Sequence, residues 1–194
     1  MDVKIDCNSI KEKIRALLPD KAVADEVISS IDEAALENGV IKIPASLLNN
    51  ELKGTVLGFI NNKYVNDYDI RFSGGAVTLT LKGNVKIALF TQSFAVRYIF
   101  RVGKFVFDSE HGHKMVASYS ESTDGIPSVL YMGYPNLLCK LTNGKQGIKA
   151  SETHIFADFE KISSASDKIK NSNVVLKYVS SEKSCLTLQF KAIC

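Results

Sequence analysis

Two histidines and two carboxylates lie within six consecutive positions, and their types are those of a metal site or a general base. The residues are Asp108, Glu110, His111 and His113. Histidines two positions apart on a strand point to the same side, and a nearby carboxylate could complete a set of metal ligands. No third histidine or cysteine is tied to this place by the sequence. We therefore interpret the cluster as a solvated hairpin tip with no bound metal.

Other reactive side chains lie along the chain without a motif that would activate them. Cys139 could be a nucleophile, but we interpret it as a buried helix cysteine, and His154 as a surface or half-buried residue. No GxSxG, GxGxxG or GxxxxGK[ST] element follows a strand. The sequence thus favours a protein that is not an enzyme and needs no cofactor. The alternative is an enzyme acting on an apolar substrate, with His111, His113 or His154 as its base.

Charge and composition restrict the classes of partner. The 194 residues carry 24 Lys and Arg against 21 Asp and Glu, a net charge of +3 without a basic block. This excess is too small to indicate nucleic-acid binding, whereas peripheral contact with an anionic membrane surface stays open. The four cysteines are widely spaced, as in a protein with reduced thiols.

The first residues and the apolar runs bear on localisation. No apolar run approaches the roughly 20 residues that a membrane-spanning helix needs, and the start of the sequence lacks the basic and apolar regions of a signal peptide. As written, the sequence predicts a soluble, cytoplasmic protein. An envelope location is the alternative if a leader has been removed.

The first third of the chain has helical periodicity. Residues 9–18 begin with a capping box and end at Pro19, and residues 20–38 form a second predicted helix. A short extended segment, 40–43, precedes a third helix expected over 44–60. The apolar side of that third helix carries Leu48, Leu52, Val56, Phe59 and Ile60.

In the middle of the chain apolar residues recur at every second position, which is typical of strands with one buried face. Gly74-Gly75 and Gly83-Asn84 are expected turns. A long strand over 93–102 follows, with a break or bulge at Gly103, and residues 109–113 form a hairpin turn before a return strand. Connections this short make neighbouring strands antiparallel.

Helical spacing returns over residues 125–147, where Pro135 should divide the segment. Residues 154–162 fit a strand and a helix equally well, and residues 174–179 and 186–190 form a closing hairpin. Helices, a meander of antiparallel strands and a final hairpin together predict an α+β fold. No repeat or long linker divides the chain, so we expect a single domain.

The strand over 93–102 places large apolar residues on one face. Burying each of them contributes about 1.5–3 kcal/mol, whether the cover is protein or an acyl chain. The sequence therefore leaves two alternatives for what covers this face, the protein's own core or a bound ligand. A curved sheet wrapped over one long helix would leave a seam along that helix, and such a seam holds lipid.

Five segments resemble, in their order and alternation, the small bacterial relatives of the tubular lipid-binding (TULIP) superfamily. The likeness covers residues 40–190 and is closest in the last two segments. The segments are VIKIPASLLNNEL (40–52), GGAVTLTLKGNVKIAL (74–89), FAVRYIFRVGKFVFDSE (94–110), HIFADFEKI (154–162) and NVVLKYVSSEKSCLTLQF (173–190).

The resemblance implies a long, strongly curved antiparallel sheet wrapped around a long helix over residues 40–194, with residues 1–38 as an N-terminal helical extension. It also implies non-enzymatic binding of phospholipid or another acyl ligand in an apolar groove between sheet and helix. The alternative is a filled-core scaffold that binds another protein, or a second copy of itself, through its N-terminal helices. The groove is expected to be lined by Leu48, Leu52, Val56, Val77, Leu79, Leu81, Val85, Ile87, Phe94, Val96, Tyr98, Phe100 and Val102, with Leu89 on the same strand face.

Overall fold

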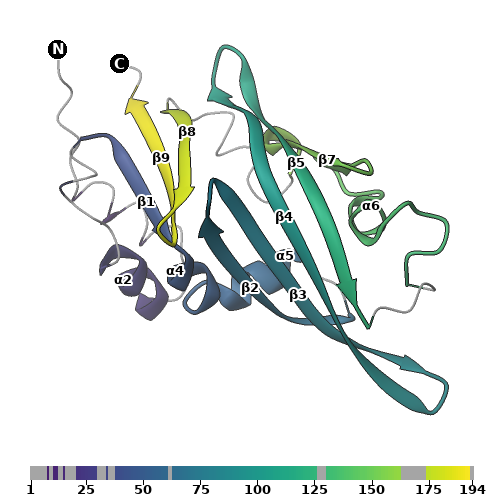
Figure 1. The fold of residues 1–194 in the computed structure, drawn as a ribbon. Helices are drawn as coiled ribbons and strands as arrows, with labels where there is room; N and C mark the ends of the chain where they lie inside the picture. The colour runs from purple at the N-terminus through teal and green to yellow at the C-terminus, as the bar shows by residue number, and fades with distance from the viewer. Residues whose placement is uncertain are drawn as a thin grey trace.

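A computed structural model describes residues 8, 11, 12, 15, 21–29, 34, 38–60, 63–125, 130–162 and 174–192 (Figure 1). In this part of the chain nine strands form one antiparallel sheet, accompanied by a few short helices, which confirms the predicted antiparallel pairing but not the predicted curvature. None of the described helices has the length and apolar composition to cross a membrane. The strands are β1 (Val40–Pro44), β2 (Val65–Ser73), β3 (Ala76–Ile87), β4 (Phe90–Asp108), β5 (Gly112–Asp124), β6 (Ile148–Ala150), β7 (His154–Asp158), β8 (Val174–Glu182) and β9 (Cys185–Ala192), and the helical elements are α2 (Lys21–Ser29), α4 (Ala45–Asn49), α5 (Lys53–Ile60), α6 (Leu137–Thr142) and the 3-10 turn η2 (Phe159–Lys161).

The 19-residue strand β4 joins the two parts of the sheet. Its first half pairs with β3, from Ile87 opposite Phe90 to Val77 opposite Phe100. Its other edge pairs with β5, and β5 in turn pairs with β7. Near its end, Phe107 lies opposite Leu176 of β8, which connects β4 to β9 and β1.

The predicted bulge at Gly103 is present. The register between β4 and β5 shifts between Val102 and Lys104. Because side chains alternate between faces, the extra residue changes the phase of the alternation. Phe105 and Phe107, opposite Met115 and His113, thereby share the face of Val102 and of the apolar residues before it.

One predicted turn is wrong. Gly83-Asn84 does not reverse the chain, since β3 runs through it to Ile87, and the turn lies at Ala88 and Leu89. Gly83 is nevertheless needed where it stands, because a Cβ there would lie 1.8 Å from the Tyr64 carbonyl oxygen. The glycine thus marks a close backbone contact inside a strand. In the sequence, a glycine required by such a contact looks the same as a glycine required by a turn.

The long third helix is also wrong. It is divided into α4 and α5, separated by residues 50–52. The Asn49 side chain acts as a pairing partner for the edge of β2, because its amide donates to the Ile70 carbonyl at 2.8 Å and its oxygen accepts from the Ile70 N–H at 2.7 Å. The Tyr68 hydroxyl donates to the Leu48 carbonyl. These contacts fix the end of α4 against β2.

The sheet is open rather than rolled around a long helix (Figure 1). The longest helix in the described ranges is α2, with nine residues. It lies within the second predicted helix, whereas most of residues 1–38 falls outside the described part of the chain. A strongly curved sheet wrapped around a helix is therefore not what the described elements form.

The remaining predictions hold in part. The described part of the predicted helical segment 125–147 contains α6. This helix begins after Pro135, where the segment was expected to divide. Residues 154–162 are a strand followed by a 3-10 turn, which accounts for their ambiguous periodicity. The closing hairpin is present as β8 and β9.

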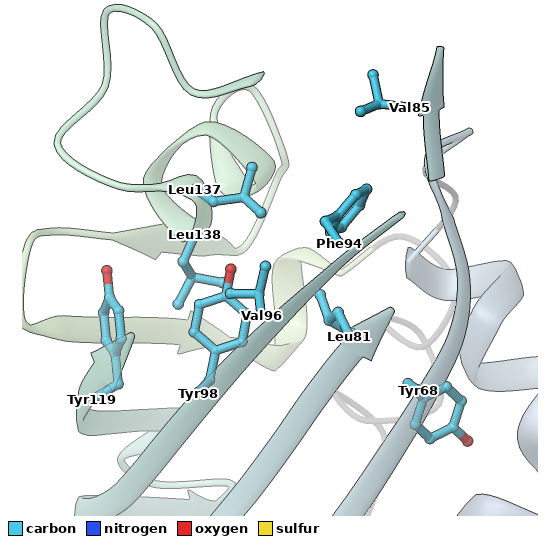
Figure 2. Packing of buried hydrophobic residues seen from close by; sticks show 9 residues of the cluster. All are labelled: Tyr68, Leu81, Val85, Phe94, Val96, Tyr98, Tyr119, Leu137 and Leu138. Atoms are coloured by element: carbon cyan, nitrogen blue, oxygen red, sulfur yellow. The ribbon is translucent and has the colours of Figure 1, made fainter. Parts of the chain in front are cut away.

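The main core lies where β2–β5 meet α5 and α6. Figure 2 shows its buried residues: Val96 and Tyr98 lie beside Leu138 of α6, whereas Tyr68 lies at the far side of the cluster. Tyr98 stacks on Phe100 with 5.8 Å between ring centroids, and both lie beside Tyr119. The buried members are Tyr68, Leu81, Val85, Phe94, Val96, Tyr98, Tyr119, Leu137 and Leu138.

Gly83→Ala should lower the free energy of unfolding by about 1–3 kcal/mol, because the added methyl group collides with backbone. Gly58→Ala is a matched control within α5, where a Cβ has nothing within 4 Å. The control should gain about 0.5–1 kcal/mol from helix propensity. Urea unfolding measures both, and a change of the same sign in the two variants would contradict the close contact at Gly83.

Candidate ligand-binding site

The face predicted to be a groove floor is covered by protein. Val96 and Tyr98 are completely buried and pack with Leu137 and Leu138 of α6. The cover of this strand is therefore made by side chains of the chain itself. Eight of the predicted groove residues belong to the core or pack against it: Val56, Leu79, Leu81, Val85, Phe94, Val96, Tyr98 and Phe100.

The other predicted groove residues lie elsewhere. Leu48, Leu52, Val77 and Val102 are half-buried and stand outside the main core cluster. Ile87 is 41% exposed near the β3–β4 turn. The ten strand residues share one strand face as predicted. Leu48 and Val56 lie in two separate helices with Leu52 between them, so the structure does not bring all thirteen residues to one surface.

A cavity of about 200 Å³ adjoins the main core. Phe94 is the one predicted groove residue that borders it. The remaining lining comes from the end of α5, the residues entering β2, and the segment around α6. The lining residues are Ile60, Tyr64, Val65, Phe94, Leu130, Leu137, Lys140, Leu141 and Lys145.

Hydrogen bonds at the start of α6 hold one wall of this cavity. The Asn136 side chain caps the helix by accepting from the Cys139 N–H at 2.9 Å. The Glu121 carboxylate of β5 accepts from the N–H groups of Leu137 and Leu138 at 3.2 and 3.1 Å. First-turn N–H groups lack partners within a helix, so these contacts attach α6 to the sheet.

A second set of contacts, from the same face of β5 and from β6, also fixes α6. The Tyr119 hydroxyl donates to the Ser151 carbonyl at 2.6 Å and accepts from the Asn136 amide at 2.8 Å. The Thr142 hydroxyl donates to the Leu138 carbonyl at 2.9 Å and accepts from the Ala150 N–H at 3.1 Å. The leucines that face the cavity are thus held on a rigid support.

Two lysines give the cavity its charge. Lys140 and Lys145 border it and are exposed, which places them at its opening. Lys145 Nζ donates to the Ile60 carbonyl at 3.3 Å and so connects the two sides of the opening. Neither lysine has a carboxylate within ion-pair distance in the part of the chain that the structure describes. The site combines apolar walls with an uncompensated positive rim.

A larger hollow of about 560 Å³ lies on the other face of the sheet. It is bordered by Lys104, Val106, Lys114 and Phe156, among others, and none of its bordering residues is buried. It is therefore a surface depression. The cavity beside α6 differs in having buried Phe94 and Leu137 in its wall, so it is the better candidate for an apolar ligand.

Burial raises the pKa of two core tyrosines. For Tyr98 the loss of solvent is the largest cause and the negative charge of Glu121 adds to it. Burial also raises the pKa of Tyr119 to about 12, while the hydrogen bond from Asn136 acts in the opposite direction. Both phenols are consequently neutral at physiological pH and serve as packing and hydrogen-bonding groups.

The structure does not bring His111 and His113 together in one environment. His111 is exposed at the hairpin turn beside Asp108, as predicted for a solvated tip. His113 contradicts that prediction, since it is 2% exposed, with its ring against Phe107 and its Nδ1 2.8 Å from Glu160. The two histidines differ because His111 lies in the turn before β5, whereas His113 lies within the strand on its covered face. Among the described residues no group of three ligand-type side chains could hold a metal ion.

Two further predictions about reactive side chains are confirmed. Cys139 is buried in α6 and His154 is exposed at the start of β7. The neighbouring Thr153 hydroxyl lies 2.9 Å from His154 Nδ1. Neither residue borders the cavity beside α6.

The lysines of the site were not predicted from the sequence, and the α6 leucines were assigned to no site. The available signal was the alternation of apolar and basic residues at Leu137, Lys140, Leu141 and Lys145. Nothing in that segment indicates that it packs against Phe94, more than forty positions earlier, because contacts between distant segments leave no local pattern.

Comparisons with known proteins find no matching family model, curated protein or solved structure. The likeness to the TULIP superfamily stays a prediction. The candidate site therefore rests on its own geometry and chemistry.

Replacing the two buried tyrosines with phenylalanine should have unequal effects on stability. The buried Tyr98 hydroxyl makes no well-formed hydrogen bond within the described structure, although the Glu121 carboxylate is near enough to raise its pKa, so Tyr98→Phe should be neutral or stabilising. Tyr119→Phe removes the bonds to Ser151 and Asn136 and should cost about 1–3 kcal/mol. Denaturant unfolding at neutral pH compares the two, and equal losses would contradict the described hydroxyl environments.

Alkaline pH should destabilise the protein through the same side chains. Tyrosine in an unfolded chain ionises near pH 10, whereas the pKa of Tyr119 is raised to about 12 and that of Tyr98 is raised further. The contribution of the raised pKa values is complete below pH 10 and is lost as pH rises above it. Unfolding free energies measured at neutral pH and above pH 10 test this, and a flat profile would contradict it.

Proposed function

We propose that this protein binds a small amphiphilic ligand without transforming it, with the apolar part of the ligand in the cavity beside α6 and its anionic group at Lys140 and Lys145. The observation that supports this proposal most directly is the pairing of an apolar wall with two exposed, uncompensated lysines at one opening. A neutral ligand would not use the lysines, and a fully polar one would not use the wall.

The cavity volume restricts the apolar part of the ligand. At about 200 Å³ it exceeds the roughly 150 Å³ of an engineered cavity that binds benzene. It is below the roughly 300–1,000 Å³ typical of drug-sized ligand sites. A short acyl chain or a single aromatic ring suits this space, whereas a pair of long phospholipid tails exceeds it.

A ligand of this kind keeps the class of function that the TULIP resemblance implies and changes its location. The predicted groove residues Val96 and Tyr98 are covered by α6. The proposed ligand instead contacts the outer side of that cover, where Leu137 and Leu141 face Phe94. A linear carboxylate is the simplest molecule that satisfies both the wall and the rim.

The length of the ligand should determine its affinity until the cavity is full. Each buried methylene contributes about 0.8 kcal/mol, or roughly a fourfold gain in affinity. Calorimetry or native mass spectrometry with linear carboxylates of increasing length should show this gain, followed by a plateau. If affinity were independent of length, the apolar wall would not be the binding surface.

Charge at the opening should matter for anionic ligands alone. Lys140→Gln combined with Lys145→Gln should weaken a bound carboxylate roughly fivefold, the effect expected for two exposed charge contacts. The same variant should bind a linear alcohol of equal length as the parent does. Lys177→Gln, an exposed lysine of β8 outside the site, is the matched control. Equal losses for the alcohol and the carboxylate would contradict the assignment of the lysines.

A further inference from the structure

The β3–β4 hairpin extends beyond the rest of the sheet as a two-stranded arm, here residues 84–93 (Figure 1). On one side the pairing of β2 with β3 stops at Gly83. On the other side the pairing of β5 with β4 stops at Ala95. Beyond these points the two strands of the arm pair with each other, and the arm ends in the turn at Ala88 and Leu89.

The end of the arm is apolar and exposed. All residues from 86 to 93 are exposed to solvent. Leu89 is 90% exposed and Phe90 78% exposed, the two highest values among the large exposed hydrophobic side chains of the described residues, and Ile87 beside them is 41% exposed. A folded chain gains nothing in water from holding such side chains at its furthest point, since their burial elsewhere would stabilise it.

The base of the arm is fixed to the body of the protein. The Gln92 side chain donates to the Gly125 carbonyl of the body at 2.8 Å, and within the arm the Ser93 hydroxyl joins the two strands by donating to Asn84 Oδ1 at 2.8 Å. The Asn84 N–H donates to the Tyr64 carbonyl at 3.0 Å. A hairpin held in this way presents its tip in a defined direction.

The charges of the arm favour an anionic surface. Between Gly83 and Phe94 the sequence contains Lys86 and no aspartate or glutamate. Lys86 has no ion pair within the described part of the chain. It lies two residues before the turn, or roughly 7 Å at the rise of a strand. Apolar groups that enter a membrane interface lie about 5–10 Å deep, so Lys86 would stand at the level of the lipid headgroups.

We propose that the arm is a membrane-docking element that inserts Leu89 and Phe90 into the interface of an anionic lipid bilayer. The area of the tip favours lipid over protein. An aromatic side chain offers about 200 Å², so the apolar tip as a whole is well below the roughly 800 Å² that one partner buries in a stable protein interface. A lipid interface, by contrast, accepts a narrow protrusion of two or three side chains.

A single tryptophan reports insertion directly, because the chain contains none. Phe90→Trp places the reporter at the tip, and Phe156→Trp places it on β7, where Phe156 is 40% exposed. With vesicles of phosphatidylglycerol and phosphatidylcholine, the emission of the Phe90→Trp variant should shift to shorter wavelength and be quenched by brominated acyl chains. The Phe156→Trp control should show neither change.

Loss of the apolar tip should abolish binding while the fold is retained. Leu89→Ser combined with Phe90→Ser should lower the vesicle partition coefficient roughly 100-fold in a sedimentation assay. Val179→Ser is the control, because Val179 is 51% exposed on β8, away from the arm. Lys86→Glu should weaken binding to phosphatidylglycerol vesicles and leave the weaker binding to pure phosphatidylcholine unchanged.

Three results would overturn the proposal. One is the absence of vesicle binding by the parent protein, and another is binding in which the β7 reporter shifts and the tip reporter does not. The third is a shift of the tip reporter without vesicles that grows with protein concentration, which would assign the arm to contact with a second copy. The carboxylate-binding assay does not involve Leu89 or Phe90, so failure of docking and failure of the proposed ligand site are distinguishable.

Discussion

The fold depends on the pairing of one long strand with three neighbours. β4 holds β3 on one edge, β5 on the other, and β8 near its end. In β4 the apolar residues of the covered face occupy even positions before Gly103 and odd positions after it. The bulge at Gly103 adds one residue, so both sets lie on the same face of the sheet. The apolar rings before and after the bulge thereby share one side of the sheet.

Covering that face requires a short helix to be held in place by polar contacts. α6 has six residues, too few to be stable by itself. Its first turn is anchored by Asn136 and by the Glu121 carboxylate, which accept the N–H groups that the helix cannot satisfy. The anchored leucines close the core on one side and form the wall of the cavity on the other. The candidate ligand site is thus a consequence of how the core is closed.

In most of the described molecule the apolar residues are buried and the charged residues are in solvent, as folding alone requires. The opening of the cavity and the end of the β3–β4 arm are two exceptions. The apolar side chains exposed at the end of the arm gain nothing from folding, and the two lysines at the opening of the apolar cavity have no carboxylate partner among the described residues. Exceptions of this kind are expected where function, rather than folding, has determined the residue. The proposed ligand has an apolar part, and the proposed docking arm would bring the protein to a lipid interface where such molecules reside, so the two proposals are compatible within one protein.

Local periodicity was enough to predict the central strands, the antiparallel pairing of neighbours along the chain and their shared apolar face, because a period of two and short connections are local properties. It did not determine where the third helix breaks, since the Asn49 contacts with Ile70 join residues 21 positions apart. Nor did it distinguish Val96, which is buried, from Leu89, which is exposed, because alternation is identical in both. Exposure and the position of Lys140 beside Phe94 depend on which distant segments cover the sheet, and only the tertiary structure decides that.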